Sequence, residues 1–150
     1  MNLSSVLGII APPGEAAYAA SKFAVRGFTE ALRHELAGTS VQVTSVHPGA
    51  IRTGIAKSSR VGAGADARKR EQETAKFEIL VRTTPERAAD RIVSGVLQGE
   101  TRILVGRDAS QLDRIQRLLP GRYWRIMGPL LDWRIGRVLT GSRDTPEAEE

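Results

Sequence analysis

The chain contains no cysteine among its 150 residues. This absence excludes disulfide bonds and metal sites built from thiolates. The sequence also shows no secretory signal peptide. Together the two absences favour a reducing compartment, and we expect a cytoplasmic protein.

The chain also lacks a long apolar run, since no stretch approaches the roughly 20 apolar residues that a membrane-spanning helix requires. With 41% hydrophobic and 26% charged residues, its composition is typical of a soluble globular chain of one domain at most. The two histidines, His34 and His47, have no second ligand at metal-binding spacing. We therefore expect both to be structural or surface residues, and we expect no metal site.

The net charge of +5 is distributed unevenly. Residues 101–143 hold nine arginines against three aspartates, whereas residues 144–150 hold four acidic side chains. The basic part also carries many apolar side chains, namely Leu118, Leu119, Tyr123, Trp124, Ile126, Met127, Leu130, Leu131, Trp133 and Ile135. Such a segment either packs as an amphipathic helix on the body or on a partner subunit, or lies on an anionic membrane surface. Nucleic-acid binding is disfavoured, because the arginines accompany apolar side chains rather than a stacking platform.

Hydrophobic periodicity and turn residues predict alternating strands and helices. In the first third of the chain we expect a strand end at about Ser5, a proline-broken loop over 8–14, a helix over Glu15–Ala37 and a strand over 41–46 ending at Pro48-Gly49. We then expect a polar loop-helix over 54–77, a helix capped by Thr84 and ending near Gly99, and a strand over 102–105. The rest of the chain should form a helix capped by Asp108 and ending near Leu119, a basic amphipathic segment over 122–139, and a disordered segment over 141–150. Strands and helices thus alternate along the chain, as in an α/β protein.

Three residues near the start form a constellation suited to proton transfer. Tyr18 and Lys22 are four residues apart, which places them on one face of a helix with about 5–6 Å between their Cβ atoms. A free phenol has a pKa near 10, and an adjacent ammonium lowers such a pKa toward the range useful for acid–base catalysis. Ser5, thirteen residues before Tyr18, supplies a hydroxyl that can hold the reacting oxygen. Ser4 is the nearest competitor for this position.

Four ordered sequence blocks resemble the short-chain dehydrogenase/reductase family. They are residues 2–8 (NLSSVLG), 18–25 (YAASKFAV), 27–33 (GFTEALR) and 46–53 (VHPGAIRT). The resemblance implies a Rossmann-like, doubly wound parallel sheet. It also implies hydride transfer between a nicotinamide cofactor, NAD or NADP, and a carbonyl or secondary alcohol.

The family's glycine-rich phosphate-binding turn is missing from these 150 residues, as are its Asn-Asn-Ala-Gly segment and its helix asparagine. We therefore expect only the C-terminal half of the family fold over residues 1–107, a basic helical extension over 108–140 and a disordered tail over 141–150. We also expect the upstream DNA to encode the missing motifs. Residues 1–150 alone should be inactive and prone to association. NAD and NADP cannot be distinguished from this half.

The resemblance also implies residue roles. Ser5 would hydrogen-bond the substrate oxygen, and Tyr18 would act as the general acid or base. Lys22 would lower the pKa of the catalytic phenol and hydrogen-bond the nicotinamide ribose. The residues matching the family's nicotinamide-binding segment are Pro48, Gly49, Ile51 and Thr53. Together with Tyr18 and Lys22 they are expected to bind the cofactor. Asn2 is expected to support the strand rather than to replace the missing asparagine.

Three functional interpretations remain open. The first is an oxidoreductase acting on a small lipophilic alcohol or ketone, with a homo-oligomer formed through the Glu15–Ala37 helix. The second is a non-catalytic remnant that acts only through this helix. The third is a weak membrane-surface contact through residues 108–140.

Overall fold

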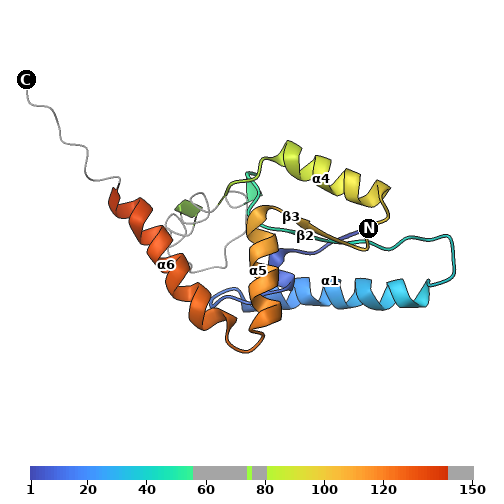
Figure 1. Cartoon of the computed structure of the whole chain (residues 1–150), viewed down its shortest axis with the longest axis horizontal. Coiled ribbons are helices and arrows are strands. Elements are labelled where there is room, and N and C mark those ends of the chain that lie inside the picture. The colour runs from blue at the N-terminus through green and yellow to red at the C-terminus, as the bar shows by residue number, and fades with distance from the viewer. Residues whose placement is uncertain (56–73, 76–80, 142–150) are drawn as a thin grey trace, which may run out of the picture.

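The computed structural model describes residues 1–55, 74–75 and 81–141, with side chains up to residue 132. Its elements are β1 (Asn2–Leu3), the 3-10 helix η1 (Val6–Gly8), α1 (Ala16–Glu35), β2 (Ser45–Pro48), α4 (Pro85–Leu97), β3 (Arg102–Val105), α5 (Arg107–Leu118) and α6 (Tyr123–Gly141). The three strands form a parallel sheet in the order β1-β2-β3. Helix α1 lies on one face of this sheet and α4 on the other (Figure 1). The architecture confirms the predicted α/β, partly Rossmann-like fold.

Strand β2 is central and shorter than predicted. Ser45 is aligned with Asn2 on one side and with Arg102 on the other. The predicted strand over 41–46 is wrong at its start, since Val41 is exposed and regular pairing begins at Ser45. The reason lies in the neighbours: β1 has only two residues and β3 begins at Arg102, so Val41 has no strand to pair with.

The core consists of two clusters on opposite sides of the structure. The first joins the sheet to α4 and contains Val46, Ala88, Ile103 and Val105. The second lies where η1 meets the two C-terminal helices, and it contains Val6, Ile9, Ile10, Ala109 and Met127. The second cluster places both α5 and the beginning of α6 against the body of the protein.

The predicted boundaries of α1 and α4 agree with the structure to within two residues. Gly38 follows α1 with a φ of 87°, a conformation that glycine adopts without steric cost and that ends helices. Thr84 caps α4 by accepting the N–H of Arg87, and Pro85 occupies the first turn. The apolar side chains Phe23 and Phe28 of α1 are exposed, so much of the helix's apolar surface has no partner in the described part of the chain.

The prediction that Asp108 caps α5 is wrong. The N-cap position belongs to Gly106, and Asp108 lies inside the first turn. Its carboxylate instead accepts the backbone N–H of Ala50, which follows β2, at 2.7 Å. A contact between residues so far apart in sequence is invisible to a local capping pattern.

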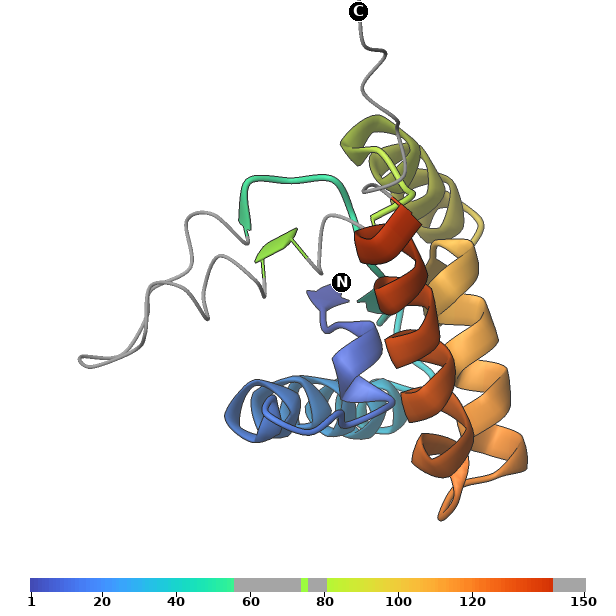
Figure 2. The same ribbon diagram turned by 90° about the vertical axis from the view of Figure 1, so that its left-hand side faces the viewer.

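Helices α5 and α6 lie beside the sheet (Figure 2). Asp113 of α5 is buried and binds Arg102 of β3 through two hydrogen bonds, while Arg117 contacts the same carboxylate. In α6, Met127 is buried, whereas Ile126 and Leu130 are exposed. Among the described residues, no helix is long and apolar enough to cross a membrane.

Candidate functional site

The candidate site lies where β1 and β2 end. Parallel strands bring their carboxyl ends to one edge of the sheet, and loops at that edge commonly form binding sites. The N–H of Ser4 donates to the carbonyl of Val46, which continues the pairing up to the site. On one side of this edge lies the first half of α1, and on the other the loop that follows Pro48.

The structure distinguishes the two adjacent serines. Ser4 is buried, and its hydroxyl donates to the backbone carbonyl of Lys22 at 2.9 Å. Ser5 is only half-buried, and its Oγ accepts the N–H of Leu7 at 3.1 Å, which caps η1. Since that contact uses an acceptor lone pair, the hydroxyl proton of Ser5 stays available to donate.

Tyr18 and Lys22 lie one turn apart on α1, as their spacing predicts. The Lys22 ammonium lies 5.5 Å from the centroid of the Tyr18 ring and donates to the carbonyl of Leu3 at 3.4 Å. The side chain of Tyr18 is 43% exposed, whereas that of Lys22 is half-buried. The ammonium therefore lies between the phenol ring and the end of β1.

Backbone hydrogen bonds hold the loop after β2. The N–H of Gly49 donates to Val105, that of Ala50 to the Asp108 carboxylate, and that of Arg52 to Thr83. Ile51 forms an isolated parallel bridge with Thr83. Pro48, Gly49 and Ile51 are half-buried, while Thr53 is exposed. The loop is thus fastened to three other parts of the chain, and the Thr53 hydroxyl remains accessible to solvent.

Sequence reasoning missed the role of Asp108. A side chain at Gly49 would overlap the Asp108 carboxylate, and so would a side chain at Gly106, which has a φ of 100°. Glycine at both positions lets the carboxylate approach the loop backbone. The two glycines flanking Asp108 in space were the only signal available, and they become informative only once the fold brings them together.

His47, in β2, is fully buried. Its Nδ1 lies 3.1 Å from the carbonyl oxygen of Ser5, and its Nε2 lies 2.9 Å from the Ser45 hydroxyl. Burial lowers the pKa of His47, and the Arg102 and Arg26 charges act in the same direction. The hydrogen bond to Ser5 and the Asp113 charge oppose this effect. The buried imidazole of His47 thus contacts the backbone of the candidate serine.

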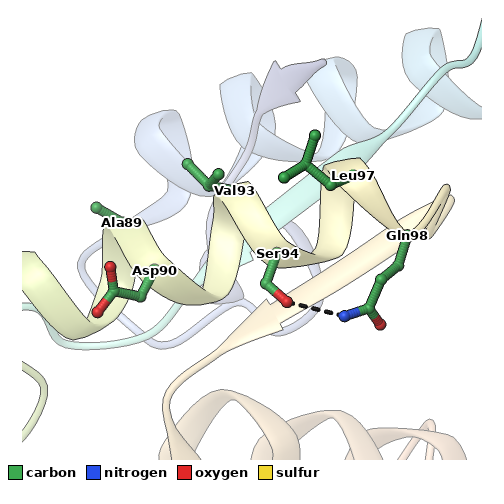
Figure 3. Close-up of a pocket in the computed structure, with 6 residues that line it drawn as sticks. All are labelled: Ala89, Asp90, Val93, Ser94, Leu97 and Gln98. Atoms are coloured by element: carbon green, nitrogen blue, oxygen red, sulfur yellow. Dashed lines mark hydrogen bonds between the residues drawn. The ribbon is translucent and has the colours of Figure 1, made fainter.

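The structure thus gathers the end of β1, α1 and the loop after β2 at one edge of the sheet. Most of the loop-helix predicted over 54–77 lies outside the described residues. Of the disordered tail predicted over 141–150, only Gly141 is described, and it is the last residue of α6 rather than disordered. No group of three metal-ligating side chains occurs in the part of the chain that the structure describes. A shallow hollow lies on the outward face of α4, lined by Ala89, Asp90, Val93, Ser94, Leu97 and Gln98 (Figure 3). Since α4 and α1 cover opposite faces of the sheet, this hollow is separate from the candidate site.

Comparison with known proteins gives one consistent result. The family model described as short chain dehydrogenase matches residues 1–63. A "Putative oxidoreductase SadH" of Mycobacterium tuberculosis is 45% identical over 131 residues, covering 85% of this chain and 46% of that protein. A "Cyclopentanol dehydrogenase" of Comamonas sp. is 53% identical over 53 residues, covering 35% of this chain and 21% of that enzyme.

A solved structure agrees with these relatives. The crystal structure of a short chain dehydrogenase/reductase from Burkholderia phymatum in complex with NAD has a TM-score of 0.65 and 26% identity. The match covers 78% of this chain and 46% of that one. The chain therefore spans about half the length of the SadH protein and of this structure.

Proposed function

Since this chain belongs to the short-chain dehydrogenase/reductase family, we propose that it carries the proton-transfer part of an NAD(P)-dependent oxidoreductase that interconverts a carbonyl and a secondary alcohol. The observation that carries the proposal is the arrangement of Tyr18 and Lys22. Both lie on α1 beside the end of β1, with the ammonium 5.5 Å from the phenol ring.

The residues present fit a nicotinamide dinucleotide. An ammonium has three N–H donors, and within the described part of the chain the Lys22 ammonium makes one hydrogen bond, the 3.4 Å contact with the Leu3 carbonyl. Lys22 can therefore also donate to a ribose hydroxyl. The exposed Thr53 and the fastened backbone of Gly49 offer further contacts to the nicotinamide. Hydride chemistry is supplied by the bound dinucleotide.

The protein's own residues handle the proton. In reduction, the Tyr18 hydroxyl gives its proton to the carbonyl oxygen as the carbon receives hydride. In oxidation, the same oxygen takes the proton from the alcohol. Ser5 donates its hydroxyl proton to the substrate oxygen and so orients the reacting group. The Lys22 ammonium, 5.5 Å from the centroid of the phenol ring, places a positive charge beside this group.

The expected substrate is a small lipophilic alcohol or ketone. One relative is named for cyclopentanol, a small alicyclic secondary alcohol, and it is 53% identical to this chain over 53 residues. The name belongs to that enzyme. For this chain it supports the substrate class and leaves the individual compound to be found by assay.

The test compares the chain alone with a fusion that places it behind the part of the Mycobacterium tuberculosis relative preceding the matched region. Carbonyl-dependent oxidation of NADH and NADPH is followed for both. In the active fusion, Tyr18→Phe should lower turnover about 10²–10⁴-fold, because the transferable proton is lost. The matched control is Tyr123→Phe, which removes the hydroxyl that accepts the N–H of Ala11. It should leave turnover within about twofold of the parent, because the loss of this hydrogen bond lowers the stability of the fold rather than the rate of proton transfer.

Two outcomes would contradict the proposal. If Tyr18→Phe retained more than about a tenth of the turnover, Tyr18 would not be the general acid. If the fusion bound neither dinucleotide while folding normally, the chain would instead be a non-catalytic remnant. Calorimetry with NADH and NADPH separates poor binding from poor chemistry.

Two surfaces support partner proposals. We expect a second copy of the chain to pack on α1, where Phe23 and Phe28 are exposed, 40% and 63% respectively. We expect the start of α6 and the residue before it to contact anionic membranes weakly, since Arg122, Arg125 and Ile126 are exposed there. Sedimentation of the Phe28→Asp variant tests the first surface, and vesicle flotation of an Arg122→Glu, Arg125→Glu variant tests the second.

A further inference from the structure

We propose that His47 is a positioning residue, which fixes the orientation of Ser5 by donating from Nδ1 to the Ser5 carbonyl. The inference rests on the proposed function, because it concerns the same reaction. Sequence reasoning gave His47 only a structural or surface role.

Both sides of the imidazole have a partner. His47 is completely buried, and its ring lies between the Ser5 carbonyl oxygen at 3.1 Å and the Ser45 hydroxyl at 2.9 Å. Ser5 belongs to the turn after β1, whereas Ser45 and His47 belong to β2. The imidazole therefore connects the turn that carries the candidate serine to the central strand.

The chemistry of the partners fixes the tautomer. A carbonyl oxygen can only accept, so the proton must be on Nδ1. In the neutral ring Nε2 is then an acceptor, and the Ser45 hydroxyl donates to it. Neutrality agrees with the surroundings, because burial lowers the pKa of His47 and the nearby Arg102 and Arg26 outnumber Asp113.

The hydrogen bond bears on catalysis because it acts on the backbone of Ser5. The Ser5 carbonyl also accepts the N–H of Gly8 at 2.9 Å, and the Ser5 Oγ accepts that of Leu7. These two local bonds shape the turn but do not place it relative to β2. The His47 contact does so together with the hydrogen bond from the Ser4 N–H to the Val46 carbonyl, and Pro48, the last residue of β2, leads into the loop proposed to bind the nicotinamide. The His47 side chain thus helps to fix the turn that carries Ser5 relative to the loop proposed to bind the nicotinamide.

Two amide substitutions separate the nitrogens of the ring. His47→Asn can place an N–H near the Nδ1 position, whereas the longer His47→Gln places its amide near the Nε2 position. In the active fusion, His47→Gln should lower kcat about tenfold with an unchanged KM for the dinucleotide, as expected when a positioning hydrogen bond is lost. His47→Asn should restore kcat to within about threefold of the parent, since its amide N–H can still donate to the Ser5 carbonyl. Ser45→Ala, which removes only the Nε2 partner, should leave kcat nearly unchanged.

A second measurement uses the 150-residue chain itself and needs no cofactor. Nitrogen-15 NMR of its histidines should show His47 with a protonated Nδ1 and an unprotonated Nε2 at neutral pH. The opposite tautomer would overturn the proposal whatever the activity. So would equal kcat values for His47→Asn, His47→Gln and the parent. If Ser5→Ala left kcat unchanged, the proposed function of Ser5 would be wrong. This failure is distinguishable from a failure of the His47 proposal, because the Ser5→Ala variant keeps His47 unchanged.

Discussion

Removing the negative charge of Asp113 should destabilise the fold strongly. This carboxylate accepts two hydrogen bonds from Arg102 of β3 and a third from Arg117 of α5. Its side chain is only 8% exposed, and that of Arg102 is 20% exposed. The Nε of Arg102 is also buried, with no hydrogen-bond partner in the described part of the chain. The positive charge of the Arg102 guanidinium is therefore neutralised by Asp113.

The size of the effect follows from this burial. Breaking a buried ion pair by removing one partner costs about 3–5 kcal/mol, because the remaining charge is left uncompensated. Arg102 keeps some solvent contact, so for Asp113→Asn we expect the low end, about 3 kcal/mol. In a chain of this length, about 3 kcal/mol corresponds to a fall in Tm of about 6–12 °C. The Arg102 hydrogen bonds also hold the pKa of Asp113 below its usual value of 3.8. This contribution is therefore present above about pH 4 and is lost as the pH falls further.

Urea unfolding followed by far-UV circular dichroism measures the free energy of unfolding for the parent and the variant. Glu30→Gln is the matched control, because Glu30 forms an i,i+4 pair with Arg26 at the surface of α1. Such a pair contributes only about 0.3–0.5 kcal/mol. If Asp113→Asn cost less than about 1 kcal/mol, the value typical of an exposed pair, the Arg102–Asp113 contact would not be the buried interaction described above.

Three further predictions concern the candidate site. Gly49→Ala should weaken dinucleotide binding about tenfold or more in the active fusion, because a Cβ at Gly49 displaces the Asp108 carboxylate, whose charge-assisted hydrogen bond to the Ala50 N–H is worth about 1.5–3 kcal/mol. Gly121→Ala is the control, because a Cβ at Gly121 meets no atom. Equal Kd values for the two variants would contradict the structure. Lys22→Ala should lower kcat and raise the KM for the dinucleotide together, and a change in kcat alone would argue against the ribose contact. Because burial depresses the pKa of His47 below its ordinary 6.5, the parent chain should lose stability as the pH falls below about 6.5, where the unfolded state binds the proton more readily. His47→Asn should remove this slope between pH 6.5 and 4.5, and a slope that persists in the variant would refute its assignment to His47.

Local patterns in the sequence were sufficient for much of the fold. The short apolar segment over 102–105 gave β3 with its observed bounds, and Thr84 with Pro85 gave the start of α4. These features depend on nearest neighbours and on capping, which the sequence displays directly. The helical spacing of Tyr18 and Lys22 is of the same kind, so their shared face could be predicted.

Features that depend on distant partners could not be predicted. Val41 is a β-branched residue of the kind favoured in strands, but it lies beyond the ends of both neighbouring strands. Asp108 is of a residue type that commonly caps helices, but its carboxylate accepts the N–H of Ala50, which lies 58 residues away in sequence. The Tyr123 hydroxyl accepts the N–H of Ala11 across 112 residues. In each case the deciding group arrives through the tertiary fold, which no local pattern contains.

The central place of β2 has a consequence for how the protein folds. Ser45 is aligned with both Asn2 and Arg102, and an entire helical crossover separates it from each. Such non-local pairing is slow, because the entropy of closing long loops is lost before the strand contacts compensate for it. Helices α1 and α4 can form within microseconds, whereas the sheet must wait for the three strands to meet. The contact between His47 and Ser5 requires β1 and β2 to be joined, so the candidate site is completed among the last events of folding.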